Sequence, residues 1–297
     1  MLGGGPIGIE MAQAHRRFGG SVTVIEAGRA LGREDPDAAQ VVLSAVRREG
    51  VEILENTSVS AARFTGDGIA LDTAAGEFSG SHLLVATGRT PTVDGMGLET
   101  AGIEIASGGI VTDAGLRTTN RRAYAIGDVT GGPGFTHLAG YQAGVVVRSA
   151  LFGLPARTRT DHIPRAIYTT PELAQVGLTE AEARAAHGPQ VEVVRVETAA
   201  NDRAVATGQG EGFLKVMVVK GRPVGATLVG QEAGEQIALW ALAMASRLKM
   251  SAIAGTVLPY PTMTELSKRA AGAYFSPRLF GNVWVKRVVR IVQRLLP

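Results

Sequence analysis

The sequence contains no cysteine, and this absence removes two kinds of chemistry from the chain. Without thiols, the chain can form neither a structural disulfide nor a redox-active thiol pair of its own. Its five histidines are scattered without the spacing of metal ligands, so we predict no metal site. No apolar run is long enough to cross a bilayer. We therefore expect a cytoplasmic protein.

Aromatic residues make up only 5% of the chain, and basic charge is concentrated at its C-terminal end. Residues 278–297 contain five basic residues and no acid, which leaves 25 basic and 27 acidic residues elsewhere, a net charge of −2. Nucleic-acid-binding domains typically combine a basic body with interleaved aromatics. We therefore expect no nucleic-acid partner. At 297 residues and 45% hydrophobic content, the chain is long enough for two domains.

The chain opens with a glycine-rich turn that fits the pattern G-x-G-x-x-G at Gly3, Gly5 and Gly8. A helical pattern follows, then a predicted buried strand over residues 21–25, and then Glu26. Such glycines allow a tight turn and let a pyrophosphate approach the helix N-terminus. An acid at the end of the second strand accepts hydrogen bonds from ribose hydroxyls and repels a 2′-phosphate. These four residues predict an NAD site, and the alternative is a structural turn without a ligand.

Only Met1 and Leu2 precede this turn. The strand that normally leads into such a turn is central in its sheet. We therefore predict that the first strand is truncated, and that the chain is the back part of a longer enzyme or has lost a piece.

The pattern along the chain predicts two segments of mixed helix and strand, residues 1–89 and 165–276, separated by residues 90–155 and a linker. Residues 1–89 predict a helix over 37–50, strands over 51–54 and 81–86, and hairpin turns at Asp67-Gly68 and Gly76. Residues 90–155 predict extended pieces and a helix over 139–151, and a linker follows over 155–164. Residues 165–276 predict strands near 191–198, 213–219 and 224–230 and helices near 179–187, 232–249 and 263–272. Thr179 and Glu182 predict a capping box at the first of these helices.

Five segments in register resemble the FAD- and NAD(P)-dependent pyridine nucleotide–disulfide oxidoreductases, the family of dihydrolipoamide dehydrogenase, glutathione reductase and mercuric reductase. The segments are Gly3-Gly4-Gly5-Pro6-Ile7-Gly8-Ile9-Glu10, Ala86-Thr87-Gly88-Arg89, Tyr124-Ala125-Ile126-Gly127-Asp128, Tyr168-Thr169-Thr170-Pro171-Glu172-Leu173-Ala174-Gln175-Val176-Gly177 and Pro259-Tyr260-Pro261-Thr262-Met263-Thr264-Glu265.

This resemblance implies an α/β fold. It places a Rossmann-like NAD-binding domain at 1–89, the C-terminal segment of an FAD-binding domain at 90–155, and an α+β dimerisation domain at 165–276 that forms a homodimer. Family members also carry an N-terminal FAD-binding region, usually with a C-x4-C disulfide. Neither is present in this sequence.

The resemblance also implies further contacts with FAD and NAD. Asp128, after a short apolar strand and Gly127, would bind the ribityl chain of FAD, and Phe135 and Thr136 would lie where the next helix contacts the flavin. Gly88 and Val59 would lie beside NAD, with Val59 at its adenine end, and Glu10 near the nicotinamide and flavin. Two alternatives stay open: Asp128 caps the following turn, or Glu10 is a favourable acid in the first helical turn.

Tyr260 and Glu265 are the predicted catalytic residues. In disulfide reductases of the family, a His-Pro-x-x-x-Glu segment supplies an acid–base pair to the partner subunit's active site. Here Tyr260 replaces the histidine, and a phenol is a poor base at neutral pH but a usable hydrogen-bond donor. Mercuric reductase-like members also carry tyrosine there, but they usually add a C-terminal cysteine pair that this chain lacks. Alternatively, Glu265 starts a helix as part of a capping box with Thr262.

Residues 277–297 predict a basic amphipathic helix, with Lys286, Arg287, Arg290 and Arg294 on one face. Such a helix is typical of contact with an anionic membrane surface, here the inner membrane face, or of packing on a protein partner. Two hypotheses for the whole chain follow. The first is a flavoprotein oxidoreductase that passes hydride from NADH to FAD and on to an unknown acceptor. The second is a non-catalytic NAD-binding and dimerisation module that associates with a membrane surface.

Overall fold

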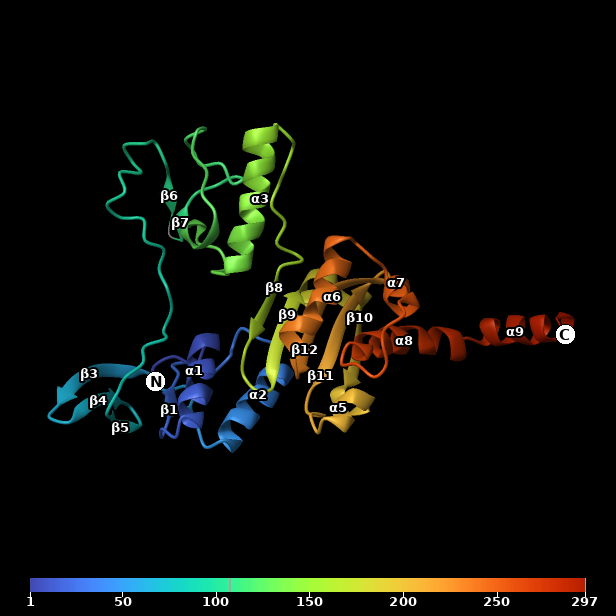
Figure 1. The fold of residues 1–297 in the computed structure, drawn as a ribbon, viewed down its shortest axis with the longest axis horizontal. Helices are drawn as coiled ribbons and strands as arrows, with labels where there is room; N and C mark the ends of the chain where they lie inside the picture. Colours follow the sequence, from blue (N-terminus) through green and yellow to red (C-terminus); the bar gives the residue numbers. More distant parts are fainter. Residues whose placement is uncertain (107, 297) are drawn as a thin grey trace. The chain divides into compact units, whose positions relative to one another are not determined.

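A computed structural model describes residues 1–106 and 108–296 of the chain (Figure 1). The chain divides into two compact units. One unit consists of Met1–Thr87 and the chain from Pro164 onward, and the other of Gly88–Ile163. The predicted nucleotide-binding and dimerisation segments therefore fold together within the first unit.

The first unit begins with a small parallel sheet and two helices. In chain order the elements are α1 (Pro6–Arg17), β1 (Thr23–Ile25), α2 (Pro36–Arg48) and β2 (Glu52–Leu54). β1 pairs with β2 in parallel, while Leu2 forms bridges with Ile25 on one side and Val85 on the other. The order β2, β1, Leu2, Val85 is that of the first strands of a Rossmann sheet. The structure thus confirms the predicted α/β fold of this segment.

The prediction of a buried strand over residues 81–86 is wrong. In the part of the chain that the structure describes, this segment forms only an isolated β-bridge, between Val85 and Leu2, and the side chain of Val85 is 61% exposed. A parallel strand needs a neighbour that pairs along its length. Among the described residues, Leu2 alone pairs with it, through bonds to the Leu84 carbonyl and the Ala86 amide.

A three-stranded antiparallel sheet follows β2, within the part of the chain that the structure describes. Its strands are β3 (Val59–Thr65), β4 (Gly68–Thr73) and β5 (Gly76–Gly80), with β4 in the centre. Thr65 pairs with Gly68 and Thr73 with Gly76, so both predicted hairpin turns are confirmed.

The remainder of the first unit is an α+β segment, as predicted. Its strands are β8 (Pro164–Ile167), β9 (Glu172–Gly177), β10 (Val191–Glu197), β11 (Phe213–Val219) and β12 (Arg222–Gly230). They form an antiparallel sheet in the order β10-β11-β12-β9-β8. The helices are α4 (Glu180–His187), α5 (Asp202–Ala206), α6 (Ala233–Ala245), α7 (Met250–Gly255), α8 (Glu265–Phe280) and α9 (Val283–Leu295), with short 3-10 turns η2 (Gly188–Gln190) and η3 (Thr198–Ala200).

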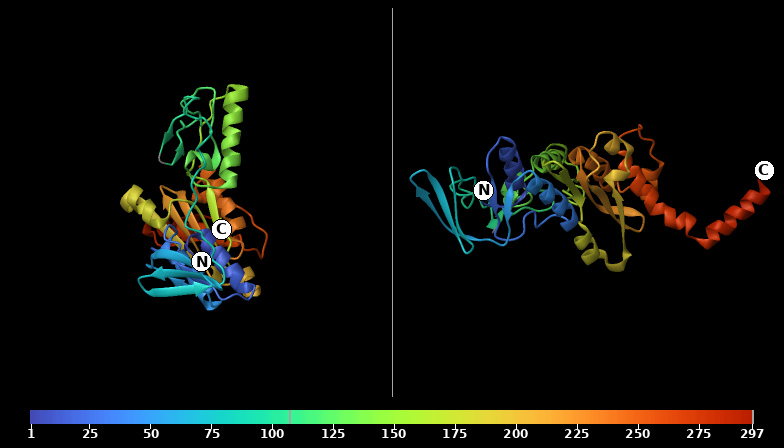
Figure 2. Two further views of the ribbon diagram at one scale, coloured as in Figure 1. Left: turned by 90° about the vertical axis from the view of Figure 1, so that its left-hand side faces the viewer. Right: turned by 90° about the horizontal axis from the view of Figure 1, so that it is seen from below.

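Two helix boundaries differ from the sequence prediction. The helix expected over 232–249 ends at Ala245, because Arg247 adopts a positive φ of 52° that ends it. The helix expected over 263–272 continues to Phe280, and α9 begins separately at Val283. Figure 2 shows the change of direction between α8 and α9. The capping box of Thr179 and Glu182 at the start of α4 is confirmed.

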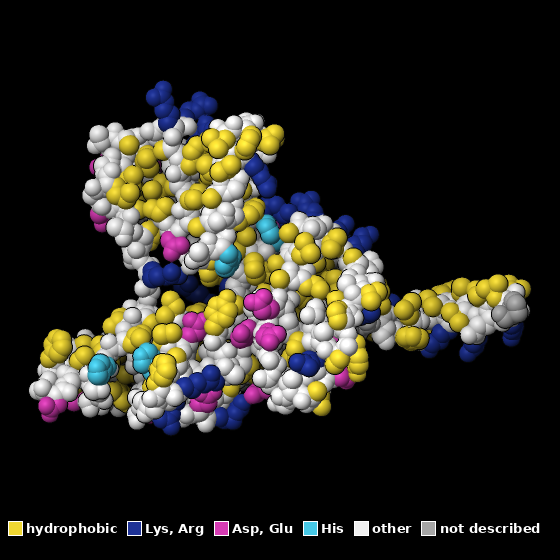
Figure 3. Space-filling model, viewed as in Figure 1, with side chains coloured by type: hydrophobic (Ala, Val, Ile, Leu, Met, Phe, Trp, Pro, Cys, Tyr) yellow, Lys and Arg dark blue, Asp and Glu magenta, His cyan; other side chains and the backbone are white. Residues whose placement is uncertain are grey.

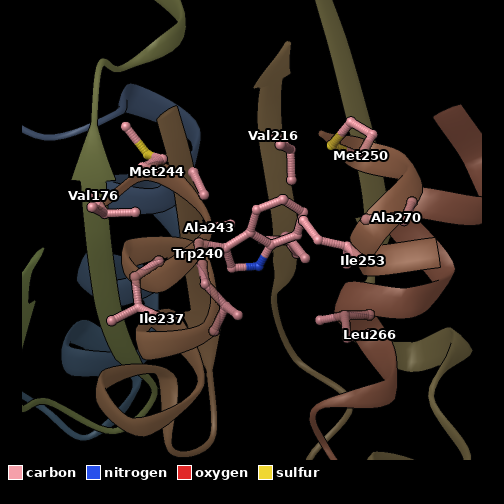
Figure 4. Packing of buried hydrophobic residues seen from close by; sticks show 14 of the residues in the cluster. Val176, Val216, Ile237, Trp240, Ala243, Met244, Met250, Ile253, Leu266 and Ala270 are labelled. Atoms are coloured by element: carbon pink, nitrogen blue, oxygen red, sulfur yellow. The ribbon is translucent and has the colours of Figure 1, made fainter. Parts of the chain in front are cut away.

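The largest fully buried side chain, Trp240 on α6, centres the core of this sheet. Figure 4 shows its indole between Val216 on β11 and Leu266 on α8. The indole nitrogen donates a 3.0 Å hydrogen bond to the hydroxyl of Ser267, so the buried N–H is satisfied. Trp240 thus fixes α6 and α8 on one face of the sheet.

A second core cluster joins the nucleotide-binding segment to this sheet. Ile9 and Val42 from α1 and α2 belong to the same buried cluster as Leu173, Phe213 and Val229 from β9, β11 and β12. The two segments are therefore one folded body.

A buried ionic cluster lies beside this hydrophobic contact. The ammonium of Lys215 on β11 lies 3.0 Å from Asp35, the residue that caps α2, 2.8 Å from Asp37 and 3.2 Å from Glu180. The side chains of Lys215 and Asp35 are 5% and 1% exposed. Burial alone would lower the pKa of Lys215, but the carboxylates outweigh it and raise this pKa above its usual value.

The second unit holds β6 (Ile105–Ala106), β7 (Gly109–Ile110), the 3-10 turn η1 (Gly127–Thr130) and α3 (Thr136–Phe152). α3 confirms the predicted helix and extends it at both ends. The expected apolar strand before Gly127 is reduced to one bridge between Arg117 and Tyr124. The two residues close a tight turn, in which the Thr118 amide bonds to the Ala123 carbonyl, so no longer ladder forms.

We predict that Lys215→Met destabilises the first unit by about 3–5 kcal/mol, because it leaves the buried Asp35 charge unpaired. Arg48→Met is the matched control, since its ion pair with Glu211 is exposed and should contribute at most about 1 kcal/mol. Urea unfolding measures both variants.

The same comparison has an expected pH dependence. The hydrogen bond between Asp37 and Lys215 lowers the pKa of the Asp37 carboxyl below its usual value. Stability from this pair is therefore present above the unfolded pKa of about 3.9 and is lost as the pH falls through the folded value. The difference between wild type and Lys215→Met should narrow in acid, and a constant difference would contradict this account.

Candidate nucleotide and acceptor sites

The glycines of the opening turn serve two different purposes. A Cβ on Gly3, whose φ is +104°, would lie 2.5 Å from the Ala86 carbonyl oxygen, and one on Gly8 would lie 2.0 Å from the Gly3 carbonyl oxygen. Both glycines are therefore required for close packing of the turn. A Cβ on Gly5 would meet no atom within 4 Å. Gly5 is thus the glycine at which a ligand can approach the backbone, at the N-terminus of α1.

Glu26 lies directly against this turn, at the end of β1. One carboxylate oxygen accepts a 2.6 Å bond from the Gly4 amide, and the other accepts a 2.9 Å bond from the Gly28 amide. Each oxygen has a second lone pair for a ligand hydroxyl. The structure therefore brings together Gly3, Gly5, Gly8 and Glu26, the four residues of the predicted NAD site.

Val59 lines a surface hollow next to this end of β1. The hollow is lined by Leu2, Ala27, Ser58, Val59, Ser60, Ala61, Ala62 and Thr87. The lining includes Leu2, which precedes the glycine turn, and Ala27, which follows Glu26. Its place fits the predicted adenine end of the nucleotide.

Glu10 does not lie in the first turn of α1, so the alternative explanation for it is wrong. α1 begins at Pro6, which places Glu10 in its second turn. There its carboxylate accepts a 2.8 Å bond from the amide of Tyr168, just after β8. Glu10 therefore ties α1 to the antiparallel sheet, and the predicted role near the nicotinamide stays a prediction.

In the second unit, the predicted FAD residues lie around the start of α3. Gly127 is buried with φ at +70°, and its amide donates a 2.6 Å bond to the Gln142 side chain. The exposed Asp128 carboxylate lies 3.5 Å from Arg89, whose guanidinium also donates to the Gly134 carbonyl.

The remaining predicted cofactor residues are placed as follows. Phe135 caps α3 and stacks on His137, and Thr136 is the first residue of the helix. Gly88 has a φ of +144° and open space where a side chain would stand. The backbone at Gly88 is thus accessible to a ligand.

Tyr260 is 69% exposed and donates a 2.9 Å hydrogen bond to Asp202, the first residue of α5. Asp202 in turn lies 3.5 Å from the guanidinium of Arg269. The bond to the Asp202 carboxylate raises the pKa of Tyr260 above its usual value, and the charge of Glu265 adds to this effect. Tyr260 is therefore a protonated hydrogen-bonding group at neutral pH.

Glu265 begins α8, as expected, but the predicted capping box is wrong. The hydroxyl of Thr262 donates a 2.9 Å bond to the Pro259 carbonyl, and the residue at the cap is Thr264, which makes no side-chain cap bond. The tight turn after Pro259 takes the hydroxyl away from the helix end. The proposed catalytic role of Glu265 stays a prediction.

Sequence reasoning missed Asp202 and Arg269 at this site. Asn201 was recognisable as a helix cap, since its side chain accepts from the Ala204 amide. No local pattern indicated that the next residue meets Tyr260, because the sheet strands β11 and β12 separate them in sequence.

Comparison with known proteins identifies the family. Residues 1–143 match the family described as pyridine nucleotide-disulphide oxidoreductase, and residues 163–271 match the dimerisation domain of the same description. The chain belongs to the pyridine nucleotide-disulphide oxidoreductase family. The resemblance read from the five sequence segments is confirmed.

Two curated relatives show how much of such a protein the chain spans. A mercuric reductase from Acidithiobacillus ferrooxidans is 37% identical over 279 residues, which are 92% of this chain and 50% of that protein. A dihydrolipoyl dehydrogenase from Geobacillus stearothermophilus is 34% identical over 91% of this chain and 59% of its own length. The chain therefore spans about half to three fifths of the curated relatives it matches.

Solved structures agree with this assignment. The HOCl-induced flavoprotein disulfide reductase RclA from Escherichia coli superposes with a TM-score of 0.83 at 32% identity, covering 91% of this chain and 63% of that one. LpdA from Mycobacterium tuberculosis gives a TM-score of 0.86 at 28% identity, covering 91% and 60%. The predicted fold class is thus confirmed.

We predict different outcomes for alanine at two glycines of the turn. Gly5→Ala should fold with nearly unchanged thermal stability, since its Cβ enters open space, but should weaken dinucleotide binding. Gly8→Ala should lower the melting temperature by several degrees, because its Cβ would overlap the Gly3 carbonyl. Calorimetric melting and NADH titration measure the two effects. Equal NADH affinity of Gly5→Ala and wild type would exclude a nucleotide at Gly5.

We also predict that Asp202→Asn lowers the pKa of Tyr260 toward about 10, because it removes the carboxylate that holds the phenol proton. Tyrosinate absorbance during an alkaline titration measures the change. In a Tyr260→Phe background the same substitution should leave the titration unaltered. A shift that persists in that background would assign it to another tyrosine.

Proposed function

We propose that this chain is the NAD-binding and dimerisation part of a flavoprotein oxidoreductase that takes hydride from NADH and delivers electrons to an acceptor near Tyr260. The observation that carries the proposal is the opening turn, in which Gly3 and Gly8 pack tightly, Gly5 stays open, and Glu26 lies alongside. The relatives favour this catalytic hypothesis over a non-catalytic module, since the matched proteins are reductases and dehydrogenases.

NAD fits the first site by its chemistry. Free amides at the N-terminus of α1 suit a pyrophosphate, and the open backbone at Gly5 gives it room. Glu26 would accept hydrogen bonds from ribose hydroxyls and would repel the extra phosphate of NADP. The hollow beside Val59 would hold the adenine.

The second unit fits part of an FAD site. Gly127 lets the backbone of η1 pack closely against α3, and the exposed Asp128 carboxylate that follows it suits a polyol hydroxyl. Phe135 and Thr136, at the start of α3, would lie beside the ring system. FAD, when bound, supplies the two-electron chemistry that side chains lack.

Tyr260 and Glu265 would serve the acceptor. The Tyr260 hydroxyl donates its hydrogen bond to Asp202, so its oxygen would accept a hydrogen bond from a ligand. The match of residues 163–271 to the dimerisation domain supports a homodimer that brings this segment to a partner subunit.

We further infer a cytoplasmic protein that makes peripheral contact with the inner membrane face through α9. In the described part of the chain, no helix is long and apolar enough to cross a membrane. α9 carries four basic residues and no acid. These features support contact with a membrane surface.

We expect Glu26→Gln to weaken NADH binding about tenfold, because ribose hydroxyls bind a carboxylate more strongly than an amide. It should also narrow the preference for NADH over NADPH, since the charge that repels the 2′-phosphate is lost. Nucleotide fluorescence titration measures both affinities. Glu52→Gln, an exposed acid on the neighbouring strand β2, is the control and should bind both nucleotides like wild type.

The redox step is tested by adding NADH to the purified protein and FAD without oxygen. The flavin absorbance should bleach with NADH faster than with NADPH, and Asp128→Asn should retain less FAD. If the protein bound neither NADH nor FAD, the proposed function would be overturned.

A further inference from the structure

The C-terminal helix α9 has an apolar surface that no part of the described chain covers. None of its described residues is buried, and several large apolar side chains point outward, among them Trp284 at 71%, Ile291 at 55% and Leu295 at 76% exposure. Isolated exposed apolar residues are ordinary on proteins, but a contiguous group of this kind marks an interaction surface.

The apolar and basic side chains of α9 lie on opposite faces. Lys286, Arg287, Arg290 and Arg294 recur at spacings of three and four residues, which places them on one side of a helix. The opposite side holds the apolar residues Trp284, Val285, Val288, Val289, Ile291, Val292 and Leu295. Figure 3 shows these two faces along the helix.

α9 begins at a fixed point and has its own cap. Asn282 accepts bonds from the amides of Trp284 and Val285, and a Cβ on Gly281 would lie 2.4 Å from the Pro277 carbonyl oxygen. The chain therefore changes element at Gly281 and begins a new helix. Leu279 and Phe280, at the end of α8, are also exposed, at 50% and 71%.

We infer that α9 lies flat on an anionic lipid bilayer, with its apolar face among the acyl chains and its four cations at the lipid phosphates. This inference rests on the peripheral membrane contact proposed above and names its lipid partner. A helix of this length covers about 20 Å of surface. A large apolar face, a basic opposite face and an aromatic residue are the features of helices that bind in the interfacial plane.

The charge pattern of α9 favours a lipid bilayer as its partner over two alternatives, a nucleic acid and a second copy of α9. Nucleic acid would neutralise the cations but leave the apolar face in water. A second copy of α9 would cover the apolar face, yet paired helices are usually held in register by opposite charges at the flanks. α9 offers cations and no acid, so two copies would repel one another. An anionic bilayer satisfies both faces at once.

The test is co-sedimentation of the full chain with vesicles of phosphatidylcholine alone or mixed with phosphatidylglycerol. We expect at least about tenfold tighter binding to the anionic vesicles, weakened by added salt. Trp284 supplies a second readout, because the other tryptophan, Trp240, is fully buried. Its emission should shift to the blue when anionic vesicles are added.

Two double variants separate the two faces. Arg287→Glu with Arg290→Glu should abolish selectivity for anionic vesicles, and Val288→Glu with Val292→Glu should abolish the emission shift. Arg121→Glu with Arg122→Glu, exposed residues of the second unit, changes the charge equally and should bind like wild type.

Each contrary outcome has its own meaning. Equal binding to neutral and anionic vesicles would overturn the lipid assignment and leave a peripheral contact. Absence of binding to both would overturn the contact as well. Self-association that Val288→Glu with Val292→Glu abolishes, without vesicle binding, would assign the apolar face to a second copy and overturn the inference.

Discussion

The close approach between the Gly8 backbone and the Gly3 carbonyl is the constraint on which the nucleotide site depends. Any side chain at Gly8 would overlap that carbonyl, so the turn and the start of α1 meet at backbone distance. This contact aims the N-terminus of α1 at the open space next to Gly5. It also brings the Gly4 amide to the carboxylate of Glu26, which links the turn to the end of β1. The proposed recognition of phosphate and ribose would thus derive from one backbone arrangement.

The nucleotide-binding segment is held to the antiparallel sheet by three kinds of contact. A shared apolar cluster buries hydrophobic side chains from both parts, and the Glu10 carboxylate accepts a hydrogen bond from the Tyr168 amide. Lys215 adds a buried ionic contact between β11 and the start of α2. Because Asp35 caps α2 and also contacts Lys215, the position of that helix is coupled to the sheet. Residues 1–87 and the antiparallel sheet therefore behave as one body in this chain.

The proposed acceptor site is built differently, from exposed polar residues. Asp202 on α5 accepts a hydrogen bond from Tyr260, which lies in the loop between α7 and α8, and forms an ion pair with Arg269 on α8. The carboxylate fixes the phenol proton, which keeps Tyr260 neutral and leaves its oxygen to a ligand. In the same unit, α9 separates its apolar and basic side chains onto two faces. Both features are exposed, and we propose that the first serves a small acceptor and the second a lipid surface.

The sequence by itself determined the local features of this protein. Glycine spacing predicted the turn before α1, periodicity predicted α2, α3, α4 and α9, and Thr179 with Glu182 predicted the start of α4. These predictions succeeded because each rests on residues within one or two turns of each other. The absence of cysteine likewise settled, without any structure, that no thiol chemistry comes from this chain.

The tertiary structure alone decided the contacts between distant residues. Residues 81–86 have the composition of a buried strand, but a strand requires a neighbour, and only a bridge to Leu2 forms in the described chain. Asp202 meets Tyr260, and Lys215 meets Asp35, because the sheet brings together segments far apart in sequence. Neither periodicity nor a capping pattern predicts contacts between residues so far apart in sequence. They follow from the packing of the whole unit, which no single segment specifies.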